Sequence, residues 1–136
     1  MSCSSAIYAA NTNPQTLTAN VAATVNFGQI VRAFGAYTNL SGGNVVINNM
    51  GYYVGDTNIT VKSTAGAVVT VQLFKNGVLI PGATSTSTIG TGATEISLSI
   101  PFMIRNTCCA ESTITAVVTS TAEGSVESAA ILLRKV

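Results

Sequence analysis

Apolar and polar residues alternate along most of this chain, and no stretch of useful length repeats with the 3.6-residue period of a helix. Ile96, Leu98 and Ile100 alternate with polar residues, and Ile114 and Ala116 do the same further on. Successive side chains of a strand point to opposite faces, so each such stretch predicts a β-strand with one face on a core.

Turn residues separate these stretches. Asn76-Gly77 tolerates positive φ at both positions, which predicts a type I′ hairpin between the strands that flank it. Pro81-Gly82 is expected to end the returning strand. Residues 83–92, rich in Ser, Thr and Gly, are then expected to form an exposed loop or a weak edge.

These turn residues divide the chain into eight to ten short strands. They are expected at residues 27–34, 44–48, 52–63, 68–75, 78–81, 94–104, 112–121 and 125–136. This number and spacing predict an all-β protein: one antiparallel β-sandwich of jelly-roll type over residues 21–136. Residues 1–20 look irregular and are expected to form an N-terminal arm with a short strand around residues 6–9.

The last strand differs from the others, because residues 129–133 are apolar at every position. Both of its faces should therefore be covered. One face would meet the core, and the other would meet either a neighbouring subunit or the N-terminal arm. Large aromatic residues are further candidates for such contacts, with one of two adjacent tyrosines facing outward. The interface candidates are Tyr52, Tyr53, Phe102, Ile131, Leu132 and Leu133.

The composition points to association. Charged residues make up 8% of the 136 residues, against roughly 25% in an ordinary soluble domain. Hydrophobic residues reach 47%, so either a neutral Ser/Thr surface encloses a rich core or apolar area is buried between subunits. Six basic and five acidic residues form no basic patch, which argues against a nucleic-acid partner.

Targeting signals are not apparent. The first residues lack a basic region followed by a continuous apolar one, and residues 129–133 are too short a stretch to cross a bilayer. We therefore expect synthesis in a cytosol, no membrane partner, and arrival at any exterior site by release or assembly.

Catalytic chemistry is poorly supported. The chain has no histidine, and therefore lacks the commonest general base and metal ligand. Its carboxylates are Asp56, Glu95, Glu111, Glu123 and Glu127, and no phosphate-binding loop accompanies them. We expect no catalytic residue, no metal site and no cofactor.

The cysteines leave alternatives open. Cys3 and the adjacent pair Cys108-Cys109 are too few for a disulfide scaffold. The pair is either reduced in a loop, disulfide-bonded to a symmetry-related subunit or to Cys3, or joined as a strained vicinal disulfide. A metal site would need three subunits to converge on an axis.

Three segments resemble the complement and tumour-necrosis-factor jelly-roll superfamily. Gly51-Tyr52-Tyr53 opens a strand as the family's Gly-X-Tyr segment does. Residues 71–77 resemble its central hairpin, and residues 128–133 resemble its small-residue-then-aliphatic last strand. The segments occur in the family's order, and the match covers residues 27–136.

The resemblance implies a ten-stranded jelly roll, a homotrimer, and a structural or binding role without catalysis. Lacking a collagen stalk, the chain looks most like the phage members of this group. It departs from the complement type in its Cys108-Cys109 pair. Asp56 is the only aspartate, which argues against a calcium site at the trimer end.

Two functions follow as expectations. The first is a homotrimeric decoration or fibre-head protein of a bacteriophage virion, made in the host cytoplasm and tethered by residues 1–20. The alternative is a trimeric module on a spore or cell surface. It would bind a glycan or receptor through the loops Gly82–Gly92 and Thr107–Glu111.

Overall fold

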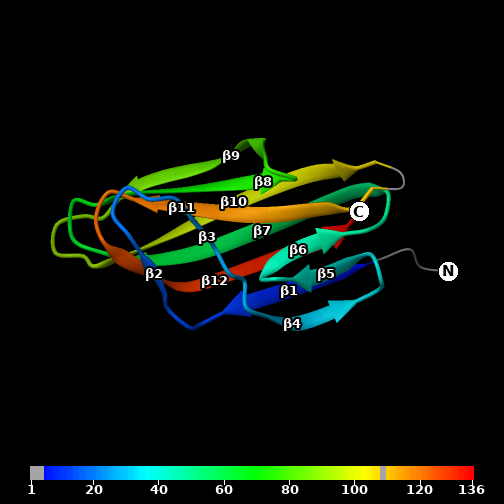
Figure 1. The fold of residues 1–136 in the computed structure, drawn as a ribbon, viewed down its shortest axis with the longest axis horizontal. Helices are drawn as coiled ribbons and strands as arrows, with labels where there is room; N and C mark the ends of the chain where they lie inside the picture. Colours follow the sequence, from blue (N-terminus) through cyan, green and yellow to red (C-terminus); the bar gives the residue numbers. More distant parts are fainter. Residues whose placement is uncertain (1–4, 108–109) are drawn as a thin grey trace.

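The computed structural model describes residues 5–107 and 110–136, which form a sandwich of two antiparallel sheets (Figure 1). Sheet A has the strand order β10-β7-β12-β1-β4, with β2 also paired to β12, and sheet B has the order β5-β6-β11-β8-β9, with β3 also paired to β11. The strands are β1 (Ala6–Asn11), β2 (Gln15–Leu17), β3 (Ala23–Thr24), β4 (Gln29–Phe34), β5 (Thr38–Ser41), β6 (Asn44–Ile47), β7 (Gly51–Lys62), β8 (Val68–Lys75), β9 (Val78–Thr88), β10 (Glu95–Asn106), β11 (Ser112–Ser120) and β12 (Gly124–Lys135).

The alternation in the sequence produces the core between the sheets. On β11, Ile114, Ala116 and Val118 are fully buried, and the residues between them face outward from sheet B. Leu73 of β8 and Ile131 of β12 meet the same core from the two sheets. The prediction of an all-β sandwich is therefore confirmed, and the two-residue period is clearest along β10 and β11.

The hairpin at Asn76-Gly77 forms as expected. The two φ angles are 52° and 80°, as a type I′ turn requires. The strand that follows does not end at Pro81-Gly82, as the turn signal predicted, but runs on to Thr88. The pairing of β8 with β9 shifts register opposite these residues, and a proline is tolerated there because β9 is an edge strand.

The N-terminal segment belongs to the sandwich. β1 is paired to β12 on one side and to β4 on the other, and β2 is paired to the start of β12. The separate arm expected over residues 1–20 is therefore wrong for residues 6–17. Asn11 at the end of β1 and Asn13 in the following turn make this region look irregular in the sequence. The irregular backbone is limited to the turn, where the N–H of Asn13 donates to Asn11 Oδ1.

The described residues form more strands than the eight to ten expected. β2 and β3 are only three and two residues long. The sequence pattern also did not predict β5, which is four residues long. No helix long and apolar enough to span a membrane occurs in this part of the chain.

Replacement of Ile114 by alanine should lower the free energy of unfolding by about 2–5 kcal/mol, because it opens a cavity in a fully buried site. Replacement of its neighbour Thr115, on the outer face, by alanine should lower the free energy of unfolding by less than about 1 kcal/mol. Urea denaturation of both variants at one protein concentration measures the difference. Equal losses would contradict the assigned faces of β11.

Candidate functional site

One row of exposed side chains crosses the whole outer face of sheet A. Strand register aligns it from β4 through β1, β12 and β7 to β10, as each residue is the cross-strand partner of the next. The row consists of Arg32, Tyr8, Leu132, Asp56 and Pro101. Two apolar side chains thus lie at its centre, with a cation on one side and an anion on the other.

The centre of this row is accessible and uneven. Tyr8 and Leu132 are 40% and 43% exposed, which is high for large apolar residues in the middle of a sheet. Hollows of about 130 Å³ and 330 Å³ flank the pair, the smaller toward Phe34 and the larger toward Asp56. We call Tyr8, Leu132 and these hollows the apolar row.

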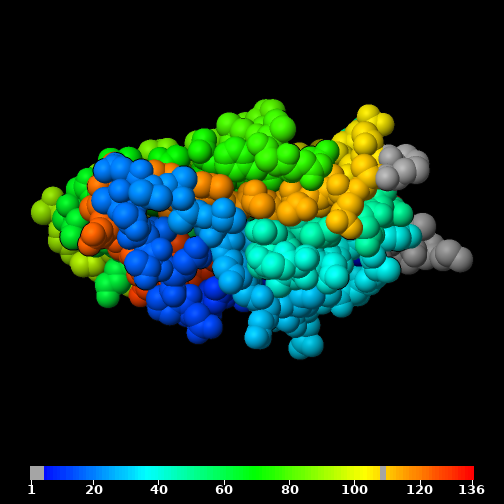
Figure 2. Space-filling model, in the orientation of Figure 1, coloured from blue at the N-terminus to red at the C-terminus, as the bar shows by residue number. Residues whose placement is uncertain are grey.

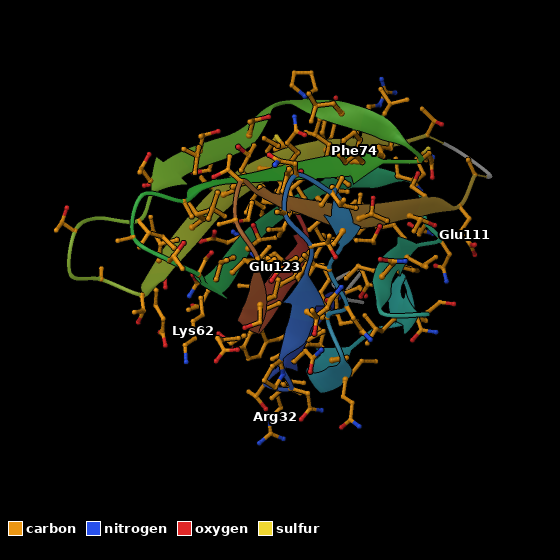
Figure 3. The ribbon with its side chains drawn as sticks, turned by 60° about the vertical axis from the view of Figure 1, so that its left-hand side comes forward. Arg32, Lys62, Phe74, Glu111 and Glu123 are labelled. Atoms are coloured by element: carbon orange, nitrogen blue, oxygen red, sulfur yellow. The ribbon has the colours of Figure 1, made fainter. Side chains whose placement is uncertain are left out.

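β4 extends the exposed surface beyond the sandwich. All six of its residues are exposed, so sheet B does not cover it, and it is one of the two edge strands of sheet A (Figure 1). Ile30, Val31 and Phe34 are 43%, 52% and 61% exposed. Figure 3 shows Arg32 projecting away from the body of the molecule at this edge. An apolar edge strand of this kind is normally paired or covered in a stable assembly.

The outer face of sheet B has a different character. Thr86, Thr70 and Thr119 form a row across β9, β8 and β11, and the first two hydroxyl groups lie 3.1 Å apart. Exposed large apolar residues on this sheet, Val78 and Leu79, are confined to the hairpin end of β9. The two faces therefore differ: the face of sheet A is suited to association, and that of sheet B is largely a hydroxyl surface.

The structure divides the six interface candidates. Tyr52 and Leu132 are 53% and 43% exposed and remain available to a partner. Tyr53, Ile131 and Leu133 are completely buried in the core of the single chain, and so they cannot present a surface to another subunit. The apolar run over residues 129–133 concealed this, because composition alone does not show which alternate positions face inward.

Phe102 is also a core residue. It is 9% exposed, and its ring lies over Gly55, where an added β-carbon would come within 2.6 Å of the ring. Gly55 thus provides the space for the aromatic side chain inside the sandwich. Expecting Phe102 at an interface was wrong for the same reason, since β10 turns it inward.

Asn49 connects three elements at the end of the sandwich where β7 begins. Its carbonyl oxygen accepts hydrogen bonds from the Tyr53 hydroxyl and the Asn106 side-chain amide, both at 3.0 Å. Its side-chain oxygen accepts a hydrogen bond from Lys135 Nζ, which also lies over the ring of Tyr37 at 4.8 Å. Burial, with a smaller contribution from Tyr37, raises the pKa of Tyr53 above its ordinary value.

The loop after β10 is anchored by a buried amide. Asn106 is 1% exposed, donates to the carbonyl of Ala110 at 3.0 Å and accepts a hydrogen bond from the Ser112 hydroxyl. No pattern in the sequence predicts this arrangement. Cys3, Cys108 and Cys109 lie outside the described residues, so the proposals for their pairing stay open.

Among the described residues, metal-ligating groups do not gather at one place. No cluster of three or more metal-ligating side chains occurs within residues 5–107 and 110–136. Glu111 and Glu123 lie well apart in Figure 3. Glu95 and Asp56 lie on the outer face of sheet A, where Lys62 and Pro101 are their cross-strand partners.

Solved structures share this fold. Murine APRIL, of the tumour-necrosis-factor family, superposes at pH 5.0 and pH 8.0 with TM-scores of 0.73 and 0.72, at 14% and 12% identity, over 98% of this chain and 99% of that protein. The phage PRD1 vertex protein P5 gives 0.67 at 10% identity, over 96% of this chain and 72% of that protein. The chain therefore has a tumour-necrosis-factor-like jelly-roll fold. It matches no protein-family model and no curated protein.

The raised pKa of Tyr53 predicts a pH-dependent stability. Below a pH of about 10, Tyr53 is neutral in the folded and the unfolded chain. As the pH rises further the unfolded chain loses the proton first, so the free energy of unfolding falls until the folded-state pKa is passed.

Denaturant titrations between pH 8 and pH 11 should show this fall in the wild type and a shallower one in Tyr53→Phe, which should also lose about 1 kcal/mol at neutral pH with its hydrogen bond. The matched control Tyr52→Phe changes the exposed neighbour and should keep the wild-type slope. Parallel curves for all three proteins would disprove the assignment.

Proposed function

We propose that this protein is a non-enzymatic structural subunit of a bacteriophage virion that assembles as a homotrimer through the outer face of sheet A. The observation that carries the proposal is the apolar row beside the uncovered strand β4. Contact between copies would remove this apolar surface from water, which is favourable, and the chain has few charged residues (8%) that would oppose it.

The arrangement of charges on this face fits a closed ring. Arg32 and Asp56 flank the apolar pair on opposite sides, three strand spacings or about 14 Å apart, which is too far for a contact within one chain. In a head-to-tail contact the β4 edge of one copy lies against the β7 region of the next, so that Arg32 meets Asp56 of the neighbour. Three such contacts close into a ring, so that no copy is left with an unmatched half of the interface at which further copies could add.

The virion assignment rests on two supports. The sequence resembles the phage members of the jelly-roll group, and the fold is similar to that of the PRD1 vertex protein P5. Residues 6–17 are not available as a tether to a larger particle, because their strands are paired within the sandwich. Attachment is therefore proposed to use a surface of the assembled trimer.

A second candidate function is recognition of a glycan, and a specific cavity favours it. The loop expected over Gly82–Gly92 is reduced, because β9 extends to Thr88. A cavity lined by uncharged amide groups opens instead beside the turn that follows β1. This function is compatible with a trimeric structural subunit.

The solution mass by light scattering after size exclusion should be three times 13.8 kDa, with or without reductant. Leu132→Arg, which places a charge in the centre of the apolar row, should shift the mass toward 13.8 kDa by weakening each contact by about 2 kcal/mol or more. Val78→Arg is the matched control, since Val78 is 70% exposed on sheet B. A monomeric wild type, or a trimeric Leu132→Arg protein, would refute the interface.

Charge reversal tests the head-to-tail contact. Arg32→Asp and Asp56→Arg should each weaken assembly, because each places like charges opposite one another across the interface. The double variant should recover about 1–3 kcal/mol of the lost association energy. Sedimentation equilibrium of the four proteins measures this coupling. Additive losses would exclude contact between the two side chains and require a different packing of the copies.

A further inference from the structure

A cavity of about 670 Å³ lies where β1 ends, between the turn into β2 and the segment that leads to β4. Figure 2 shows the face on which these parts of the chain meet. The described residues that line the cavity are all uncharged, and its accessible lining is mainly polar. Its polar side chains, which define what we call the amide cleft, are Asn11, Thr12, Asn13, Gln15, Asn26 and Gln29.

Hydrogen bonds within the cleft hold three of these amides in place. Asn11 Nδ2 donates to the carbonyl of Asn26 at 3.0 Å. Gln15 Oε1 accepts from the backbone N–H of Asn26 at 3.1 Å, while Gln15 Nε2 donates to the carbonyl of Thr24 at 2.7 Å. The β1–β2 turn and the segment before β4, distant in sequence, are thereby joined into one wall.

Two glycines let this wall form. Asn26 Oδ1 accepts from the N–H of Gly28 at 2.7 Å and lies so close to Gly43 that an added β-carbon there would clash with it. At Gly28, with φ at +72°, an added β-carbon would come within 2.7 Å of the carbonyl oxygen of Ala10. The amides are therefore fixed before any ligand arrives, which reduces the entropy that binding would cost.

The cleft retains much unused hydrogen-bonding capacity. Asn11 and Gln15 each use one of their two side-chain N–H groups, and Asn26 uses its side-chain oxygen alone. Within the described part of the chain, the side chains of Asn13 and Gln29 have no hydrogen-bond partner. Donors and acceptors thus lie side by side in one cavity, three of whose amides are held in place by hydrogen bonds.

We infer that the amide cleft binds a neutral saccharide. Each sugar hydroxyl both donates and accepts a hydrogen bond, as does each amide group. An anion would find no cation there, and an apolar ligand would leave the amides unpaired, which costs free energy. The volume falls within the usual range for small-molecule sites, about 300–1,000 Å³.

This inference rests on the second candidate function, glycan recognition, and gives it a site and a ligand class. It requires nothing of the trimer, because the lining residues come from a single chain. Assembly and saccharide binding can therefore fail separately.

The test is a titration of the full-length, isotope-labelled protein, followed by the NMR signals of its backbone amides. The probes are neutral methyl glycosides of glucose, galactose and mannose, N-acetylglucosamine and its disaccharide, with glucuronate and benzoate as charged and aromatic controls. We expect at least one neutral sugar to shift the signals of Asn11, Gln15 and Asn26. Glucuronate should bind more weakly than glucose, and benzoate should leave these signals unchanged.

Variants then assign the contacts. Asn13→Ala combined with Gln29→Ala removes two amides that do not support the fold, and it should weaken binding at least about tenfold through two lost hydrogen bonds. Gln72→Ala removes an amide from the outer face of sheet B and should leave the affinity unchanged.

Three outcomes overturn the inference: no response to any neutral sugar, shifts confined to residues outside the amide cleft, or an unchanged affinity in the double variant. If sugar binding fails while the wild type remains trimeric, glycan recognition is rejected and the structural function stands. If a monomeric protein binds the sugar at the cleft, the reverse holds.

Discussion

The hydrogen bonding of β12 along both of its edges is the constraint on which the rest of the sandwich depends. β12 pairs with β7 on one side and β1 on the other, and this fixes which of its residues face inward. Ile131 and Leu133 therefore complete the core, while Leu132 between them is left on the outer face. Because β1 and β12 come from opposite ends of the chain, sheet A forms only when contacts of very long sequence separation form, which is intrinsically slow.

Local patterns in the sequence predicted most of the fold. Strands such as β10 and β11 and the turn at Asn76-Gly77 follow from alternation and from residues that tolerate positive φ, so they could be found without tertiary information. Pro81-Gly82 has the same local appearance as a strand end, and only its place at a sheet edge makes it a bulge. A short strand was expected around residues 6–9, but its pairing inside sheet A and the strand β2 were missed, because polar turn residues interrupt the pattern there.

The candidate sites were harder to predict, because one depends on strand register and the other on side-chain hydrogen bonds between separate segments. The apolar run over residues 129–133 indicates a buried strand but not which of its side chains face inward. The pairing of Leu132 with Tyr8 and Asp56 places its side chain on the outer face. The amide cleft joins residues fifteen positions apart, Asn11 and Asn26, through side-chain bonds to the backbone. Nothing in the spacing of asparagines reveals such a pairing.

The backbone N–H of Lys135 donates to the carbonyl of Ser5, so the start of β1 and the end of β12 are neighbours (Figure 1). Any polypeptide that precedes β1 therefore leaves the sandwich at the same pole as any polypeptide that follows β12. Two appendages would compete for space at that pole. The turns at residues 64–66 and 90–93 occupy the opposite pole, which would then be the one free to point outward from a larger body.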